Sequence, residues 1–308
     1  MSNDISRARE QLRKIPFFSS EGTDRVGIVR MGGLTNLVFR VDCEGDSYVL
    51  RLPGKGTEEY IDRGFEATAA REVARVGVAP ELIYVDPKTG VMVTAFVKST
   101  TMTPALFKSI PGAPARAGEV LKRLHASDAK LDFRFELFGM IDEYLRVLSG
   151  KTVDLPQGYH DVLKEAEGVR RALSARPLPL TACHCDPLCE NFLDTGSRMW
   201  LVDWEYSGMN DPLWDLGDVS VEAQMGPKEE EEMIAAYFGG EPKPAERGRI
   251  VIYKAMCDLL WTLWGLIQHA NKNPADDFWA YANNRFARCK ALMADRTFAA
   301  HVGAVMKG

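Results

Sequence analysis

The sequence lacks a long apolar run near its start, and it lacks any block of lysine and arginine. Residues 1–20 mix charged and apolar side chains, unlike a secretory signal, so we expect a cytoplasmic protein. The 308 residues carry a formal net charge of -5, which disfavours the basic surfaces that bind nucleic acids and anionic membranes. The most apolar stretch, 255–270, contains Asp258, Gln268 and His269 and predicts a buried helix. We therefore expect neither a nucleic-acid partner nor membrane insertion, and the composition predicts no oligomeric state.

Cysteine is scarce, and its spacing is not that of a disulfide framework. The chain has six cysteines at scattered positions, and without a secretory signal we expect them to be reduced thiols. Cys183, Cys185 and Cys189 lie close to His184, a grouping that also occurs in zinc sites. No matching second group of cysteine and histidine follows, so we predict thiols packed beside a chain segment rather than a metal centre.

Internal repeats and low-complexity segments are also lacking, and the pattern of apolar residues changes once along the chain. Up to about Val97 it predicts one helix at 66–76 and strands at 26–30, 37–42, 48–52, 81–85 and 91–96. After Lys98 apolar residues recur every three or four positions, as in helices, with short strands only between 180 and 202. We predict a two-lobed α+β fold, with a small antiparallel-sheet N-lobe at 1–97 and a larger, mainly helical C-lobe at 98–308.

One segment of the chain, from His184 to Tyr206, carries most of the chemistry. It begins with the pattern H-x-D-x-x-x-x-N, continues through a short apolar strand, and then presents a second aspartate. In phosphoryl transfer from ATP, one carboxylate receives the proton of an alcohol, while a carboxamide and a second carboxylate hold magnesium. Asp186 is the candidate base, and Asn191 and Asp203 are the candidate magnesium ligands. The spacing predicts a kinase that uses ATP and Mg²⁺, although each residue alone also fits an ordinary loop.

The residues expected to bind the phosphates of ATP lie in the N-lobe. Gly32, Gly33, Thr35 and Asn36 belong to a turn between two strands, where glycine lets backbone N–H groups approach a phosphate closely. No Gly-Lys-Ser/Thr follows, so the turn is not a Walker loop. The position of the turn, ahead of the other parts, favours a phosphate-binding role.

A cation and a carboxylate are expected to complete the phosphate clamp. Arg51 lies on the third strand and Glu66 begins the following helix, as in two-lobed kinases that bind the α- and β-phosphates through such a pair. Arginine stays charged and offers a rigid fork of donors. A surface charge pair is the other explanation of this spacing, and Glu72 is an alternative partner for the arginine.

Two further residues are expected to support the reacting loop. His184 is predicted to hydrogen-bond the backbone near Asp203, because a histidine beside a catalytic loop can brace it without titrating. Asp215 follows Asp211-Pro212 and either braces the loop or caps the helix that begins there.

The acceptor is expected to meet aromatic side chains. Trp261 and Trp264 share one face of a helix, and Glu205 and Tyr206 follow the second magnesium ligand. Rings with a nearby carboxylate suit a compact, weakly hydrated cation such as trimethylammonium, at about 0.5–2 kcal/mol per ring contact. Periodicity alone favours an ordinary core stripe for the two tryptophans.

These motifs together resemble one family. The pattern from His184 to Asn191, with Asp203-Trp204-Glu205-Tyr206 and Asp215-Leu216-Gly217, resembles the choline/ethanolamine kinase family within the aminoglycoside-phosphotransferase-like group. Four further segments resemble the bacterial choline-kinase branch of this family: Gly32 to Asn36, Tyr48 to Gly54, Gly77 to Tyr84, and Leu260 to Trp264. The resemblance implies a protein-kinase-like fold and Mg-dependent transfer of the γ-phosphate of ATP to the hydroxyl of choline or ethanolamine.

By the same resemblance, one or both tryptophans line the acceptor site, and the residues named above take their roles as base, metal ligands and phosphate clamp. Two other classes of function remain open. One is a kinase of another small alcohol, such as an aminoglycoside, thiamine or a sugar. The other, and the least expected, is a nucleotide-binding pseudokinase, because Asp186 and Asp203 are both present.

Overall fold

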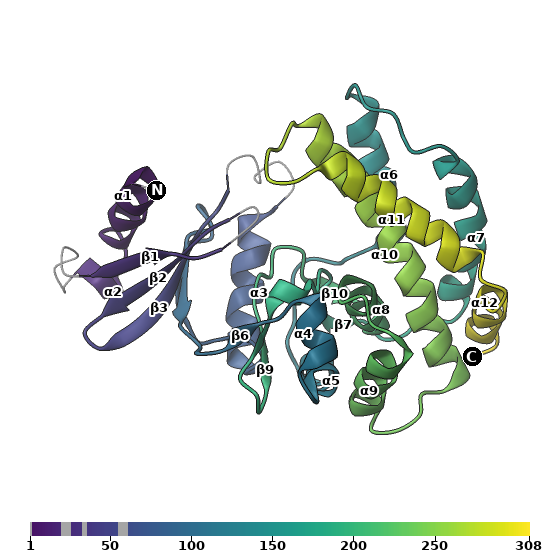
Figure 1. Cartoon of the computed structure of the whole chain (residues 1–308), viewed down its shortest axis with the longest axis horizontal. Coiled ribbons are helices and arrows are strands. Elements are labelled where there is room, and N and C mark those ends of the chain that lie inside the picture. Colours follow the sequence, from purple (N-terminus) through teal and green to yellow (C-terminus); the bar gives the residue numbers. More distant parts are fainter. Residues whose placement is uncertain (1, 20–25, 33–35, 55–60) are drawn as a thin grey trace.

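The chain folds into two lobes that lie side by side (Figure 1). The computed structural model describes residues 2–19, 26–32, 36–54 and 61–308. The smaller lobe contains a five-stranded antiparallel sheet, and the larger lobe is mainly helical with two small sheets. The predicted fold class is therefore confirmed.

The sheet of the smaller lobe has the strand order β1-β2-β3-β5-β4. The strands are β1 Gly27–Arg30, β2 Leu37–Cys43, β3 Asp46–Leu52, β4 Leu82–Val85 and β5 Met92–Ala95, close to the predicted ranges. Phe39, Val41, Leu50 and Leu52 are almost completely buried, as alternation along a one-sided sheet requires. Arg51 stands between the last two of these and faces the other side of the sheet.

Two short helices precede the sheet, and the apolar pattern of the sequence did not predict them. They are α1 Ser2–Leu12 and α2 Pro16–Ser19. α1 is mostly polar, but Ala8 and Leu12, one turn apart, are completely buried with Phe18 in the core of this lobe. The helices cover an end of the sheet that is distant from the larger lobe in Figure 1.

Helix α3, Arg63–Arg75, connects the two lobes and begins three residues before the predicted start. It begins there because the Asp62 side chain accepts hydrogen bonds from the backbone N–H groups of Gly64 and Phe65. Its inner face, including Val73, packs into the core of the larger lobe. This packing places the first turn of the helix at the boundary between the lobes.

The larger lobe consists mainly of helices and contains two small sheets of short strands. The helices are α4 Pro104–Ser109, α5 Ala113–His125, α6 Leu137–Ser149, α7 Tyr159–Ala175, α8 Leu213–Glu222, α9 Pro227–Phe238, α10 Pro244–Ala270, α11 Phe278–Met293 and α12 Phe298–Lys307. The strands are β6 Thr100–Thr101, β7 Thr181–Cys183, β8 Phe192–Asp194, β9 Met199–Leu201 and β10 Gly208–Asn210. β7 pairs with β10, and β6, β8 and β9 form a second sheet.

Helix α10 is the central helix of this lobe and contacts α6, α8, α11 and α12. It is long and apolar enough to cross a membrane by composition, but 83% of its most apolar window is buried inside the protein. The prediction of a buried helix is therefore confirmed. Two glycines allow close packing around it: a Cβ on Gly217 would lie 2.9 Å from Ile250 O, and one on Gly265 would lie 2.6 Å from Tyr281 Cδ1. The short distances bring α8 and α11 against α10.

Candidate active site

The loop that follows β7 is held by one buried carboxylate. Asp215, in the first turn of α8, accepts hydrogen bonds from the backbone N–H groups of His184 at 2.8 Å and Cys185 at 2.9 Å. Cys185 has a φ of 66°, a left-handed conformation that costs energy for a residue with a Cβ. The two hydrogen bonds stabilise that conformation and thereby direct the next residue, Asp186.

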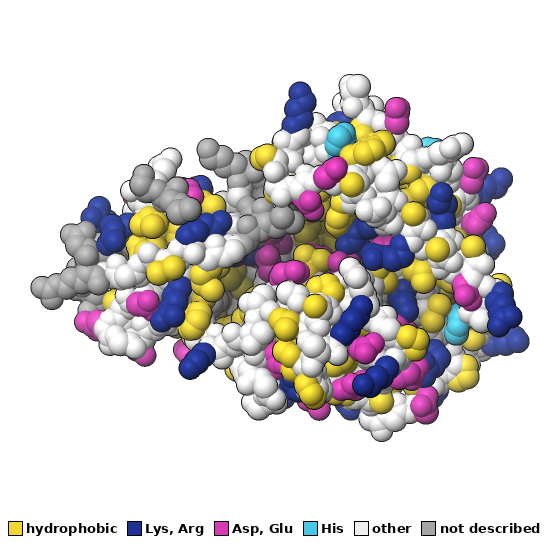
Figure 2. All heavy atoms as spheres, in the orientation of Figure 1, with side chains coloured by type: hydrophobic (Ala, Val, Ile, Leu, Met, Phe, Trp, Pro, Cys, Tyr) yellow, Lys and Arg dark blue, Asp and Glu magenta, His cyan; other side chains and the backbone are white. Residues whose placement is uncertain are grey.

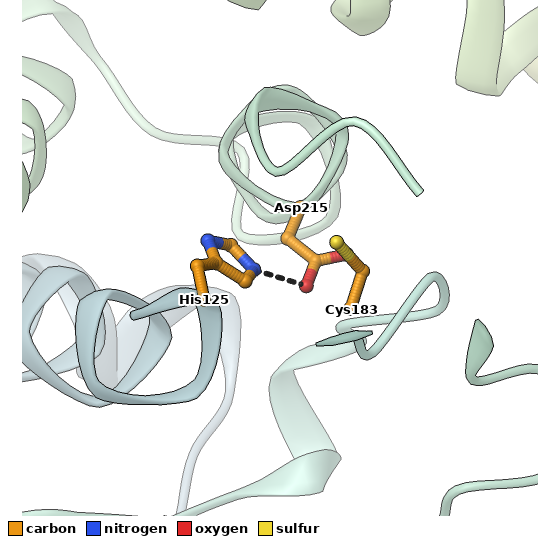
Figure 3. Close-up of side chains that lie close together, drawn as sticks. All are labelled: His125, Cys183 and Asp215. Carbon is orange, nitrogen blue, oxygen red and sulfur yellow. Dashed lines mark hydrogen bonds and ion pairs between the residues drawn. The ribbon is translucent and has the colours of Figure 1, made fainter. Parts of the chain in front are cut away.

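The carboxylate of Asp215 is itself held by His125 of helix α5, a residue that the sequence analysis did not identify. His125 Nε2 lies 2.9 Å from Asp215 Oδ2, and His125 Nδ1 lies 2.9 Å from the Tyr237 hydroxyl of α9. Figure 3 shows the His125 ring directed at Asp215, with Cys183 on the other side of the carboxylate. No local pattern connects these side chains, because 90 residues separate the histidine from the aspartate.

The side chains of His125, Cys183 and Asp215 have ligand atoms within 4.8 Å of one another, but they do not fit a metal site. Burial raises the pKa of the Cys183 thiol well above its usual range, which disfavours the thiolate that binds metals. The carboxylate of Asp215 is already an acceptor for two backbone N–H groups and a ring nitrogen. All six cysteines are free thiols, and five of them are buried.

The predicted base and the two predicted metal ligands are tied together by backbone hydrogen bonds. Asn191 Nδ2 donates to the backbone oxygen of Asp186 at 3.0 Å, and the backbone N–H of Val202 donates to Asn191 O at 3.0 Å. His184 Nε2 lies 2.9 Å from Val202 O, which is the backbone contact near Asp203 that the sequence predicted. Asp203 then follows in a left-handed conformation with a φ of 67°.

Asp186 is half-buried, and its surroundings disfavour the ionised form. Burial raises the pKa of its carboxyl well above the usual range, and the charges of Glu222 and Asp203 raise it further, while Arg285 lowers it. The carboxyl therefore lies within the electrostatic influence of groups from both sides of the site. Strongly shifted pKa values of carboxyl groups are common at functional sites, where burial and neighbouring charges are combined.

The predicted cation–carboxylate pair is formed in the smaller lobe, and its arginine also reaches a carboxylate of the larger lobe. Arg51 forms a buried ion pair with Glu66, and its Nη1 lies 2.9 Å from Asp203 Oδ1. The alternative partner, Glu72, instead pairs with Arg75 at 2.7 Å on a partly exposed surface. Arg51 thus joins strand β3, helix α3 and the carboxyl that follows β9.

A second arginine belongs to this cluster and was missed from the sequence. Arg63 Nη1 lies 2.8 Å from Glu66 Oε2 and 2.9 Å from Glu205 Oε1. Asn36 Nδ2 donates to the same Glu205 oxygen at 3.0 Å, and Asn36 Oδ1 accepts a hydrogen bond from the backbone N–H of Gly54 at 3.2 Å. Glu205, which the sequence grouped with the tryptophans, therefore pairs with Arg63 and Asn36 beside the Arg51–Glu66 pair.

Part of the predicted phosphate-binding turn lies outside the described residues, namely Gly33 and Thr35. The backbone oxygen of Gly32 accepts a hydrogen bond from Arg30 Nη1 at 2.6 Å, and the same nitrogen donates to Val38 O at 2.9 Å. Arg30 thereby joins the two strands at the point where the turn begins.

The oxygens in the cluster suit a hard divalent cation. Ligand atoms of Glu66, Asp203 and Glu205 lie within 4.8 Å of one another. Burial and the charge of Glu205 raise the pKa of Asp203 to about 7, although Arg51 lowers it. The side-chain nitrogen of Asn191 donates to the backbone oxygen of Asp186, so the side-chain oxygen of Asn191 is the atom suited to a cation. Carboxylate and amide oxygens are the ligands that magnesium prefers.

The aromatic residues predicted to meet the acceptor lie together. Trp264 Nε1 donates to the Tyr206 hydroxyl at 2.9 Å, and the Tyr206 ring packs against Trp261 with centroids 5.3 Å apart. Tyr281 of α11 was not predicted, and its ring centroid lies 5.7 Å from that of Trp264. Trp261 is 3% exposed and so belongs to the core as well, whereas Trp264 is half-buried.

Acidic side chains from α8 lie close to these rings, and they too were missed. Glu222 forms an ion pair with Arg285, whose guanidinium lies 4.7 Å from the centroid of the Tyr281 ring. Asp218, one turn before Glu222, has its Oδ2 3.5 Å from the indole nitrogen of Trp261. Figure 2 shows a hollow between the lobes where acidic and hydrophobic side chains gather.

Known proteins resemble this chain over most of its length. The model of the family described as choline/ethanolamine kinase matches residues 28–234. The crystal structure of a choline/ethanolamine kinase family protein from Mesorhizobium loti is 62% identical, with a TM-score of 0.90 over 99% of this chain and 100% of that one. Choline kinase LicA from Streptococcus pneumoniae is 25% identical, with a TM-score of 0.77 over 94% of this chain and 98% of that one. Ethanolamine kinase 1 from Mus musculus is 25% identical over 299 residues, 82% of this chain and 80% of the relative.

Proposed function

Because the chain belongs to the choline/ethanolamine kinase family, we propose that it transfers the γ-phosphate of ATP, with magnesium, to the hydroxyl of choline or ethanolamine. One observation carries the proposal. The backbone of Asp186 is tied through Asn191 and Val202 to the segment of Asp203, which pairs with Arg51 of the phosphate clamp. Glu222, which pairs with Arg285 beside the Tyr281 ring, also acts on the Asp186 carboxyl. A base between a phosphate site and a cation site suits transfer to the hydroxyl of an amino alcohol.

The residues of the loop and clamp divide the work of the reaction. Asp186 orients the hydroxyl and accepts its proton as the oxygen attacks the γ-phosphorus. Arg51, held by Glu66, supplies positive charge to the phosphates of the nucleotide. Asn191 and Asp203 would hold magnesium, which neutralises phosphate charge in the transition state when it is bound. Asp215 and His125 keep the loop in the conformation that this geometry needs.

Recognition of the acceptor rests on charge and on ring faces. Glu222 supplies a carboxylate at the edge of the aromatic cluster, and Arg285 orients it through their ion pair. Trp264 and Tyr206 form a hydrogen-bonded pair of rings, which is a rigid surface for an alkylated ammonium group. A cation over such a ring gains about 0.5–2 kcal/mol per contact.

The test is a screen of ATP consumption with purified protein and four acceptors: choline, ethanolamine, thiamine and an aminoglycoside. We expect turnover with choline or ethanolamine, magnesium dependence, and little ATP hydrolysis without an acceptor. Turnover only with the aminoglycoside or thiamine would contradict the proposed acceptor while leaving the reaction type intact. Nucleotide binding without turnover on any alcohol would favour the pseudokinase.

Replacement of Trp264 tests whether the rings contact the acceptor. We expect Trp264→Ala to raise the KM for the amino alcohol by about 10-fold or more, because a ring face and its packing area are lost, and to leave the KM for ATP nearly unchanged. Initial rates at varied concentrations of each substrate separate the two constants. Trp279→Ala is the matched control, because this tryptophan is 40% exposed and packs on His269 outside the cluster. Equal rises in both KM values would assign Trp264 to the core.

A further inference from the structure

One buried carboxylate in the acceptor region lacks a hydrogen-bond partner on one of its oxygens. Asp218 is 0% exposed, and among the described residues its Oδ1 has no partner. Its Oδ2 accepts only a long hydrogen bond, 3.5 Å, from the indole nitrogen of Trp261. Buried polar atoms are almost always paired, and an unpaired carboxylate oxygen is costly. A bound group that donates a hydrogen bond would remove that cost.

The position of Asp218 connects it to the acceptor site. Trp261 contacts Asp218 through its indole nitrogen and Tyr206 through its ring, so the tryptophan joins the carboxyl to the aromatic cluster. Glu222 lies one turn further along α8 and therefore on the same face of the helix. The close packing of Gly217 against Ile250 and Tyr253 brings α8 against α10, the helix that carries Trp261.

The charges that face Asp218 come from several elements. Glu222 and Asp215 of α8 and Asp186 of the catalytic loop are acidic, and Arg285 of α11 supplies the opposing positive charge. Burial raises the pKa of Asp218 well above its usual range, and the charges of Glu222 and Asp186 raise it further. A cation beside these carboxyl groups favours their ionised forms, so the cluster is suited to a positively charged ligand.

We propose that Asp218 accepts a hydrogen bond from an N–H of the acceptor's ammonium group, and so favours amino alcohols whose ammonium group carries N–H donors over choline, which has none. The inference rests on the proposed function. Ethanolamine carries three N–H donors on its ammonium group, whereas choline carries none. Both cations are attracted by Glu222 and the rings, but only the N–H donors of ethanolamine satisfy the free oxygen of Asp218. With choline bound, this buried oxygen would stay unpaired, and the cost of an unpaired group is what lets a site discriminate between two such ligands.

The test compares Asp218→Asn with the wild type on acceptors in which methyl groups replace the N–H groups of the ammonium one by one: ethanolamine, N-methylethanolamine, N,N-dimethylethanolamine and choline. Asparagine keeps the shape and one carbonyl oxygen for Trp261, but it places an amide N–H donor where the second oxygen stood. We expect kcat/KM for ethanolamine to fall by about 10- to 100-fold, the methylated amines to lose progressively less, and choline to change less than about 3-fold. The wild type is expected to use ethanolamine within about 10-fold of choline.

Ser220→Ala is the matched control, because Ser220 is also buried in α8 and donates its hydroxyl to the backbone oxygen of Leu216. It reports the effect of a small change in the same helix, and we expect the ratio of ethanolamine to choline activity to stay constant. Asp218→Ser repeats the test with a side chain that retains an acceptor for Trp261, in case the asparagine variant is unstable.

Two results would overturn the role of Asp218. One is an equal loss, or no loss, across the four amines in the variants. The other is a wild-type enzyme that phosphorylates choline but rejects ethanolamine. Failure of the proposed function is a separate result, because the wild type would then phosphorylate none of the four alcohols.

Discussion

Asp186→Asn is expected to lower kcat by about 10²- to 10⁴-fold, the range that a positioned general base contributes. Asparagine has the size of aspartate and can still accept a hydrogen bond from the alcohol, but it cannot take the proton. The affinity for ATP should stay within a few-fold, because the base acts on the acceptor hydroxyl and the phosphates are held by Arg51 and its neighbours. Steady-state rates give kcat, and calorimetry with a non-hydrolysable nucleotide gives the affinity.

The control for this variant is Asp194→Asn. Asp194 is another buried aspartate close in sequence, at the end of β8, where it pairs with Arg116 at 2.6 Å. Its replacement breaks a mostly buried ion pair and should lower the thermal unfolding midpoint without a large change in kcat of the folded enzyme. If Asp186→Asn kept kcat within about 3-fold of the wild type, another group would have to be the base.

Asp203→Asn is expected to have the second large effect, a loss of about 100-fold or more in turnover at a fixed magnesium concentration. The variant loses a charged ligand for the cation and the carboxylate that Arg51 contacts at 2.9 Å. Excess magnesium should restore part of the activity, because a weakened site can be filled by mass action. A magnesium titration of the initial rate shows both effects.

The thermal unfolding midpoint of Asp203→Asn shows whether its loss of activity comes from the metal site or from unfolding of the protein. Burial and Glu205 raise the pKa of Asp203 to about 7, which means that the folded protein disfavours its ionised form. A neutral amide therefore should not lower the unfolding midpoint at pH 8. Asp128→Asn is the control. Like Asp203, Asp128 pairs with an arginine of the smaller lobe, Arg75, at 3.0 Å, but this pair lies at the surface. Such exposed pairs contribute about 0–1 kcal/mol, so activity should persist. An unchanged magnesium dependence in Asp203→Asn would remove it from the metal site.

The parts of the molecule that the sequence predicted well are those in which neighbours along the chain are neighbours in space. The strands of the smaller lobe follow from alternating apolar residues, and α10 follows from a long apolar pattern. Helix α1 was missed because it is mostly polar and only a narrow stripe of it, Ala8 and Leu12, is buried. Helix propensity is a weak signal where tertiary packing supplies the stability.

The site also divides into parts that local sequence predicted and parts that depend on tertiary packing. The pattern from His184 to Asn191 lies in one tight loop, so its spacing predicts that the base and the metal ligand are close together. The sequence grouped Glu205 with the aromatic rings because it lies between Asp203 and Tyr206. In the structure Asp203 is left-handed, and the Glu205 carboxylate that follows pairs with Arg63. Side-chain direction after such a turn does not follow from spacing alone.

By itself the sequence determined the fold class and the type of reaction, because the reacting groups belong to short segments with characteristic spacing. The charged residues beside the predicted aromatic cluster were decided only by tertiary structure. Glu222, Arg285 and Tyr281 come from α8 and α11, and they meet because close packing on α10 brings those helices together. The unpaired oxygen of Asp218 likewise exists only in the packed protein, where burial removes the water that would otherwise bind it.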